Sequence, residues 1–245
     1  MTILAIDTST QWCSVALVQF GGVSAHGQEA PFSLVRHENL GPESSQHALD
    51  WVEALLDEAQ LSFRDLEGIA VGIGPGAFTG IRIGVGIGQG MALGGDLPCL
   101  PVICLDAVAL EGIRSLNIPS GAHLLVATDA RMNEVYWASY EVSADGLPVC
   151  LGDIYLSAPE TVEPPSSGFY LLGNAVTAYP EAMSNLMSQA IAVDALVVPH
   201  ARSIATLGLD ALRKGLQVSA MDLQPIYVRD KVAQTIAERA QNSQG

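Results

Sequence analysis

The sequence predicts an α/β fold of two lobes, each built on a mixed sheet flanked by helices. Each half of the 245-residue chain opens with short apolar segments separated by polar turns, which is typical of antiparallel strands. Each half then alternates strands with helical segments, the order that builds parallel β–α–β units. We therefore expect a first lobe at residues 1–104 and a second at 105–245, with the last helical segment packing back on the first lobe.

The first lobe begins with apolar, β-branched segments that predict strands at residues 2–6 and 13–20. A glycine pair then signals a hairpin turn, after which a third strand is expected at 23–29. The apolar residues that follow recur at helical spacing, with Ser44 or Ser45 as the candidate helix cap. The remaining elements are expected to alternate as helix 45–60, strand 68–73, helix 79–93, strand 97–103 and helix 106–116.

The second lobe repeats this order of elements without a close repeat in sequence. Residues 123–128 and 135–142 predict a strand hairpin, and 151–156 a third strand of the same meander. The polar tail after Gln234 is expected to fray. The elements between meander and tail are expected to be strand 170–172, helix 180–190, apolar segment 193–198 and helix 203–214.

The charge balance is strongly acidic, with 26 acidic and 11 basic residues and a formal net charge of −15. Affinity for nucleic acid comes largely from neutralising phosphates with Lys and Arg, so this surface is expected to repel DNA and RNA. The four cysteines form no CxxC pair, which favours buried thiols in a reducing compartment. With no leader segment and no apolar run of membrane-spanning length, we expect a cytoplasmic protein without a membrane partner.

A turn rich in hydroxyl groups follows the first strand. In phosphate-binding folds such a turn presents hydroxyl and N–H groups to a phosphate, with the aspartate placed to hold Mg²⁺ through water. Asp7, Thr8 and Ser9 are therefore candidate phosphate-binding residues. The alternative is a turn that satisfies its own backbone, and the motif taken alone favours that alternative.

A glycine-rich loop follows the strand at 68–73 and opens a helix. Backbone N–H groups at a helix N-terminus bind anions, which makes Gly74, Gly76 and Thr79 candidate phosphate-binding residues. The loop lacks the lysine of a P-loop and does not match GxGxxG. The alternative is a tight strand-to-helix crossover capped by Thr79, which leaves Phe78 and Arg82 unexplained.

The helix after this loop is rich in glycine, a residue that costs about 1 kcal/mol relative to alanine inside a helix. Its glycines form two series spaced four residues apart, which are Gly80, Gly84 and Gly88, and Gly86, Gly90 and Gly94. Small residues let a neighbouring backbone approach closely. Either both faces pack within the chain, or one packs on the chain's own sheet and the other on a helix of a partner.

No residue pattern indicates a reaction centre. The five histidines contain no pair at helical i, i+3 or i+4 spacing, so there is no local metal motif. There is no nucleophile elbow, and no cysteine has an obvious histidine partner. We therefore expect no catalytic residue and no metal ligand.

Four segments resemble the TsaB (YeaZ-like) family of bacterial tRNA threonylcarbamoyladenosine biosynthesis proteins. They occur in family order at residues 6–10, 74–82, 129–136 and 225–229, and the GPGxFTGxR loop is the most specific of them. The resemblance implies a two-lobed actin/Hsp70/sugar-kinase-like (ASKHA) fold. It also implies a role in forming threonylcarbamoyladenosine (t6A) at position 37 of tRNAs that read codons starting with A.

The resemblance further implies that the chain is a non-catalytic scaffold subunit. In this family the catalytic subunit is the paralogue TsaD, which holds a metal through two histidines. The matching stretch here is 103–108, where Cys104 and Val108 occupy the ligand positions and cannot form that site. No cofactor is implied, and ATP would be held at most weakly at a vestigial phosphate site.

The resemblance also implies the partners and the surface that binds them. TsaD and the ATPase TsaE are the partners, a homodimer forms in their absence, and tRNA is contacted only indirectly through the complex. Family members dimerise through their first two helices, which are predicted here at 45–60 and 79–93. The matching interface residues are Trp51, Leu55, Gly80, Gly84, Gly88 and Met91.

Two other functions stay open at this point. The first is a nucleotide-binding small-molecule kinase or ATPase of the same fold, which would use Asp7 and the glycine loop. The second is a metallopeptidase, a name attached to the wider family. The absence of metal-spaced histidines argues against it.

Overall fold

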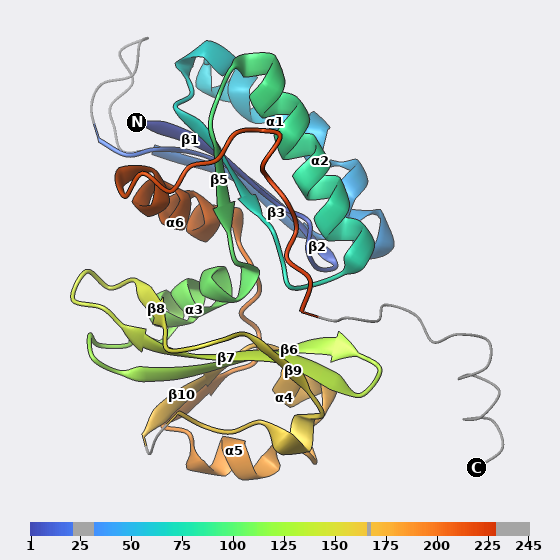
Figure 1. The fold of residues 1–245 in the computed structure, drawn as a ribbon, viewed down its shortest axis with the longest axis vertical. Coiled ribbons are helices and arrows are strands. Elements are labelled where there is room, and N and C mark those ends of the chain that lie inside the picture. Colours follow the sequence, from blue (N-terminus) through green and yellow to red (C-terminus); the bar gives the residue numbers. More distant parts are fainter. Residues whose placement is uncertain (22–31, 166–167, 229–245) are drawn as a thin grey trace, which may run out of the picture.

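The computed structural model describes residues 1–21, 32–165 and 168–228 of the chain. It confirms the α/β class, with two mixed sheets in two lobes that follow one another along the long axis (Figure 1). The strand predicted at 23–29, the tail after Gln234 and the last residue of the 225–229 motif lie outside the described residues.

The first sheet has five strands in the order β3-β2-β1-β4-β5. The three strands on one side are antiparallel, and β4 and β5 continue from β1 in parallel. All residues of β1 and β4 are buried, as their continuous apolar sequences predict. The strands are β1 Thr2–Asp7, β2 Trp12–Gln19, β3 Phe32–Asn39, β4 Gly68–Gly72 and β5 Cys99–Val102.

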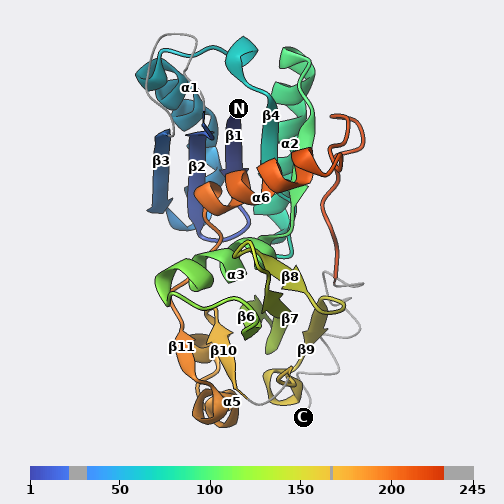
Figure 2. The same cartoon turned by 90° about the vertical axis from the view of Figure 1, so that its left-hand side faces the viewer.

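Helices cover both faces of this sheet (Figure 2). Because side chains alternate along a strand, Leu4 and Ile6 pack against α1, whereas Ile3 and Ala5 pack against α6. The sheet is therefore completed by a helix that returns from the far end of the chain. The helices of this lobe are α1 Ala48–Ala59, α2 Phe78–Gly95 and α6 Ala201–Arg213.

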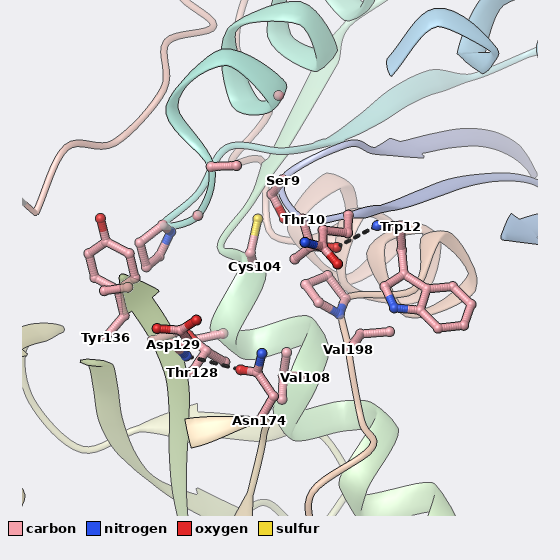
Figure 3. A pocket seen from close by; sticks show the side chains of 18 of the residues that line it. Ser9, Thr10, Trp12, Cys104, Val108, Thr128, Asp129, Tyr136, Asn174 and Val198 are labelled. Carbon is pink, nitrogen blue, oxygen red and sulfur yellow. Dashed lines mark hydrogen bonds between the residues drawn. The ribbon is translucent and has the colours of Figure 1, made fainter. Parts of the chain in front are cut away.

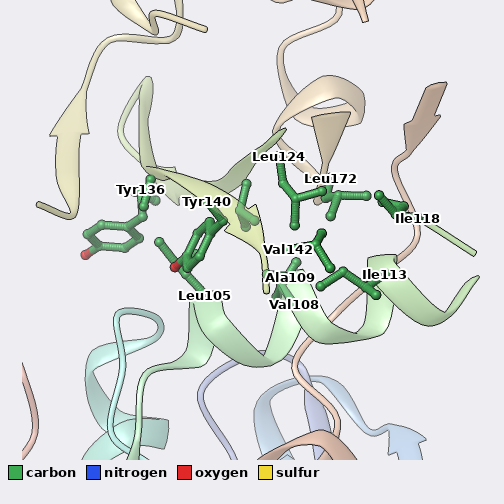
Figure 4. Close-up of a cluster of buried hydrophobic side chains, with 13 residues drawn as sticks. Leu105, Val108, Ala109, Ile113, Ile118, Leu124, Tyr136, Tyr140, Val142 and Leu172 are labelled. Atoms are coloured by element: carbon green, nitrogen blue, oxygen red, sulfur yellow. The ribbon is translucent and has the colours of Figure 1, made fainter. Parts of the chain in front are cut away.

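The second sheet has six strands, ordered β11-β10-β6-β7-β8, with β9 also paired to β7. Helix α3 packs on one face, where Leu105 and Val108 contact an apolar cluster that includes Tyr140 (Figure 4). The short helices α4 and α5 cover the other face. The elements are α3 Cys104–Ser115, β6 His123–Arg131, β7 Glu134–Val142, β8 Pro148–Cys150, β9 Tyr155–Ser157, β10 Phe169–Leu172, α4 Ala175–Ala178, α5 Ser184–Gln189 and β11 Ala192–Asp194.

A polar network joins the lobes where α3 meets α6. The guanidinium of Arg114 donates to Ser203 Oγ over 2.8 Å and to Thr206 Oγ1 over 3.0 Å. Glu111 accepts from Ser203 Oγ at 2.5 Å and pairs with Arg202 at 3.2 Å. The contact between the lobes is therefore specified by charge as well as by packing.

Both predicted helix caps are wrong. Ser44 and Ser45 lie in a 3₁₀ helix at Gly41–Gln46, and α1 starts only at Ala48. The residue directly before α1, its N-cap, is therefore neither serine. Helix α2 starts at Phe78, one residue before the predicted Thr79. It does so because Ala77 N–H is already bonded to Ser9 O at 2.6 Å, which fixes the chain's entry into the helix.

Three strand and helix predictions need correction. The strand predicted at 151–156 forms only at its end, as β9; the chain bends at Gly152 between β8 and β9, which both pair with β7. The helix predicted at 180–190 is shortened to α5, since residues 180–183 form turns, and the short α4 before it was not predicted. Strand β3 was not predicted, because its sequence alternates less clearly and it ends in polar residues. Among the described residues, no helix is long and apolar enough to cross a bilayer.

Candidate functional site

A cleft of about 560 Å³ lies between the lobes (Figure 3). The β1–β2 turn and the glycine loop form its upper wall, the start of α3 forms its floor, and the β6–β7 hairpin forms the opposite wall. Three of the six predicted phosphate-binding residues line this cleft, namely Ser9, Gly76 and Thr79. The other three, Asp7, Thr8 and Gly74, are not part of its lining.

Asp7 is turned away from the cleft and is 1% exposed. Its Oδ1 accepts from the N–H and the hydroxyl of Ser9, at 3.1 and 2.9 Å, and its Oδ2 accepts from the thiol of Cys104 at 3.3 Å. Gly72 leaves just enough room for this carboxyl group, because a Cβ there would overlap Oδ2. Burial raises the pKa of Asp7, and the hydrogen bonds from Ser9 only partly oppose that rise.

The hydroxyl turn and the glycine loop bind each other directly. Thr8 Oγ1 donates to Gly80 O at 2.8 Å, and Ala77 N–H donates to Ser9 O at 2.6 Å. A Cβ at Gly76 or at Gly80 would overlap a carbonyl oxygen of the turn. These glycines therefore serve close backbone packing, and the residues do not fit a Mg²⁺-bound triphosphate reaching Asp7.

The opposite wall of the cleft carries a carboxylate whose charge is already matched. Asp129 Oδ1 accepts from Arg131 N–H and from Tyr179 OH, both at 2.8 Å, and Arg131 Nη1 lies 3.2 Å from Oδ2. Asn174 holds the strand by accepting from Asp129 N–H at 2.9 Å. The segment matched to the family at 129–136 thus forms the β6–β7 hairpin and shapes the cleft.

Cys104 and Val108 begin α3 at the floor of the cleft. The Cys104 thiol accepts from Gly74 N–H at 3.1 Å, and burial beside Asp7 raises the pKa of the thiol well above its usual range. Val108 is fully buried in the core of the second lobe. Among the described residues, no three His, Cys, Asp or Glu side chains converge as a metal site.

The two glycine series of α2 do face different environments, but the predicted interface used the wrong series. A Cβ at Gly84 would lie 2.6 Å from Thr8 Oγ1, and one at Gly88 would lie 2.5 Å from Val71 Cγ2. The series that contains Gly80, Gly84 and Gly88 therefore packs on its own lobe. Leu55 is also excluded from an interface, since it is 0% exposed.

The second series faces open space. A Cβ at Gly86, Gly90 or Gly94 would meet nothing within 4 Å. These three residues border a shallow apolar groove between α1 and α2, here called the α1–α2 groove. Trp51 packs half-buried beside the α1 core and is not part of the lining. The groove is lined by Leu49, Phe63, Ile83, Gly86, Ile87, Gly90, Met91, Gly94 and Gly95.

Phe78 and Arg82, the unexplained residues of the loop, contact a residue from the end of the described chain. The Arg82 guanidinium lies over the Phe78 ring and beside the ring of Tyr227. The sequence offered no signal for this contact, because Tyr227 is distant along the chain. The outward glycines, by contrast, were visible in the sequence as a series, but the sequence did not show which way that series faces.

Two mixed sheets covered by helices on both faces, with a cleft between the lobes, define a protein of the actin/Hsp70/sugar-kinase-like class. The family model described as "TsaD: tRNA N6-adenosine threonylcarbamoyltransferase" matches residues 38–237. The tRNA threonylcarbamoyladenosine biosynthesis protein TsaB of Escherichia coli K12 is 34% identical over 95% of this chain and 96% of its own length. The protein of the same name from Haemophilus influenzae is 30% identical over 95% of each chain.

A solved structure agrees with these sequence matches. YeaZ from Pseudomonas aeruginosa has a TM-score of 0.80 and 34% identity, covering 92% of this chain and 99% of its own. The chain therefore belongs to the TsaB (YeaZ) family of tRNA threonylcarbamoyladenosine biosynthesis proteins.

Proposed function

We propose that the chain is the non-catalytic subunit of a t6A-forming complex, which modifies position 37 of tRNAs that read codons starting with A. It pairs through the α1–α2 groove with the catalytic paralogue TsaD, supports the ATPase TsaE, and forms a homodimer through the same surface in their absence. The observation that carries this proposal is the open glycine series of Gly86, Gly90 and Gly94 beside an apolar groove.

The energetics of α2 support a partner at this surface. Each helical glycine costs about 1 kcal/mol relative to alanine, so the three outward glycines together cost roughly 3 kcal/mol. No described residue of the chain packs against them to offset this. A partner helix could approach them more closely than ordinary side chains allow, and it would bury the exposed Leu49 and Ile83.

Three further observations support a scaffold rather than an enzyme. Asp7, the candidate Mg²⁺ residue, is buried and bonded to Ser9 and Cys104. By the family resemblance, Cys104 and Val108 occupy the positions of the paralogue's metal ligands. The net charge of −15 disfavours direct contact with tRNA, so contact through the complex is the proposed route.

The test is to co-express the full chain with TsaD, purify through a tag on TsaD, and measure the mass of the complex with and without ATP and TsaE. We expect the chain to form a stable complex with TsaD, and we expect no t6A formation by the chain when TsaD is omitted. A chain that does not co-purify with TsaD, or that forms t6A without it, would contradict the proposal.

A nucleotide-binding kinase or ATPase is the second candidate, favoured by the 560 Å³ cleft between the lobes. Isothermal titration of the chain with ATP and Mg²⁺ separates the two functions. The scaffold proposal expects weak or undetectable binding. Tight binding that disappears in Asp7→Ala would favour the enzyme, provided that thermal unfolding shows the variant to be folded.

A further inference from the structure

An exposed arginine near the start of α2 lies over one aromatic ring and beside another. Arg82 Cζ lies 3.2 Å from the ring centroid of Phe78 and 5.0 Å from that of Tyr227. All three side chains, here called the arginine cluster, are exposed, with Phe78 at 42% and Tyr227 at 52%. The guanidinium is therefore fixed by the rings and still reaches solvent.

Arg82 forms no ion pair with any residue that the structure describes. The arginines that do pair with carboxylates are Arg36, Arg114, Arg131 and Arg202. Within the described part of the chain, Arg82 is thus held by aromatic rings and not by a carboxylate. Its N–H donors lie in the guanidinium plane, so a ring over the face leaves them available to an acceptor.

The cluster is ordered by contacts outside it. Ile226 N–H donates to Ile73 O at 2.9 Å, and Gln89 Nε2 donates to Leu223 O at 2.8 Å. These bonds fix the C-terminal segment along α2, where Figure 1 shows it running beside the helix. Tyr227 is held next to Arg82 before any ligand arrives, which lowers the entropy lost on binding.

We propose that the arginine cluster binds an Asp or Glu carboxylate on the paralogue that covers the α1–α2 groove, an inference that rests on the proposed function. Arg82 and Gly86 are four residues apart and so share one face of α2, and Gly86 borders that groove, so a partner seated there passes beside Arg82. A carboxylate matches the guanidinium with two parallel hydrogen bonds.

The alternatives fit the cluster less well. A nucleobase would need an aromatic face for stacking, and Arg82 already covers the face of Phe78. An RNA phosphate would meet the repulsion of a chain with net charge −15. A second copy of the chain is strongly acidic too, so like-charge repulsion between two copies favours a less acidic partner.

The test titrates purified TsaD into the wild-type chain, Arg82→Ala, Arg82→Lys, Gly90→Leu and the control Arg213→Ala, at low and high salt. Arg213 is an exposed arginine in the last turn of α6, away from α2. We expect Arg82→Ala to weaken the Kd about 10- to 100-fold, the range for hydrogen bonds to a charged group. Arg82→Lys should weaken the Kd nearly as much, because lysine, although it keeps the charge, loses the planar fork that forms two parallel hydrogen bonds. The control should bind as wild type does.

The outcomes separate this inference from the proposed function. If Gly90→Leu abolishes binding while both Arg82 variants bind like wild type, the cluster has no part in the interface and the proposed function stands. If the wild-type chain does not bind TsaD, both fail. Full affinity in Arg82→Lys, or a loss confined to homodimerisation or to tRNA binding, would also overturn the inference. Thermal unfolding of each variant checks that the fold is retained.

Discussion

Two glycine-to-alanine substitutions on α2 should have opposite effects on stability. At Gly90 the new methyl group points into open space, so the variant gains the difference in helix propensity, about 1 kcal/mol. At Gly88 the propensity gain is the same, but the methyl carbon would lie 2.5 Å from Val71 Cγ2 and 3.4 Å from Leu223 Cδ2. Val71 is β-branched and fully buried in a central strand, so it cannot swing aside.

Because the propensity term cancels between the two variants, their difference isolates the steric cost. Overpacking a core costs about 1–3 kcal/mol, so Gly88→Ala should be less stable than Gly90→Ala by about that amount. Urea unfolding followed by circular dichroism measures both free energies of unfolding. Each kcal/mol corresponds to about 2–4 °C in Tm for a chain of this size. Equal stabilities in the two variants would refute the assignment of the inward and outward glycine faces.

Three further predictions concern polar groups that the fold brings together. Because burial raises the pKa of Asp7 in the folded state, the folded chain loses stability as pH rises through that pKa. Asp7→Asn should remove this loss. Comparing the free energy of unfolding of wild type and variant at pH 4 and pH 8 tests this. The pKa of Asp106 is raised to about 6 by burial, and Tyr140 OH donates to it at 2.8 Å. Tyr140→Phe should therefore destabilise by about 1–3 kcal/mol, more above pH 6 than below, and a pH-independent loss would contradict this. Arg114→Ala should cost about 1–3 kcal/mol by removing donors to two hydroxyls, and unchanged urea unfolding would contradict it.

Much of the fold was predictable because burial shows directly in the sequence. The continuous apolar run of β4 and the alternation in β7 were recognised from composition and period alone. Strand β3 was missed because it is an edge strand with several polar residues, and its place depends on pairing with β2. The helix caps were wrong because the first turns of α1 and α2 are set by neighbouring backbone contacts, which single residues do not reveal.

The candidate site was less predictable, because it depends on how elements are oriented toward one another. The two glycine series were evident, but the direction of each depends on how α2 rotates onto its sheet. Leu55 was correctly assigned to the apolar stripe of α1, but that stripe faces the core and not a partner. The contact of Asp7 with Cys104 was not predictable, because Cys104 lies far along the sequence and meets Asp7 only in the folded chain.

The most direct test of the proposed function is the affinity of Gly90→Leu for TsaD. Gly152→Leu is the matched control, since a Cβ there also meets nothing within 4 Å and Gly152 lies on the second lobe. Both variants should remain folded, because a Cβ at either position points into open space. We expect Gly90→Leu to lose the complex while Gly152→Leu binds like wild type. A folded Gly90→Leu that binds TsaD with wild-type affinity would contradict the assignment of the α1–α2 groove as the partner surface.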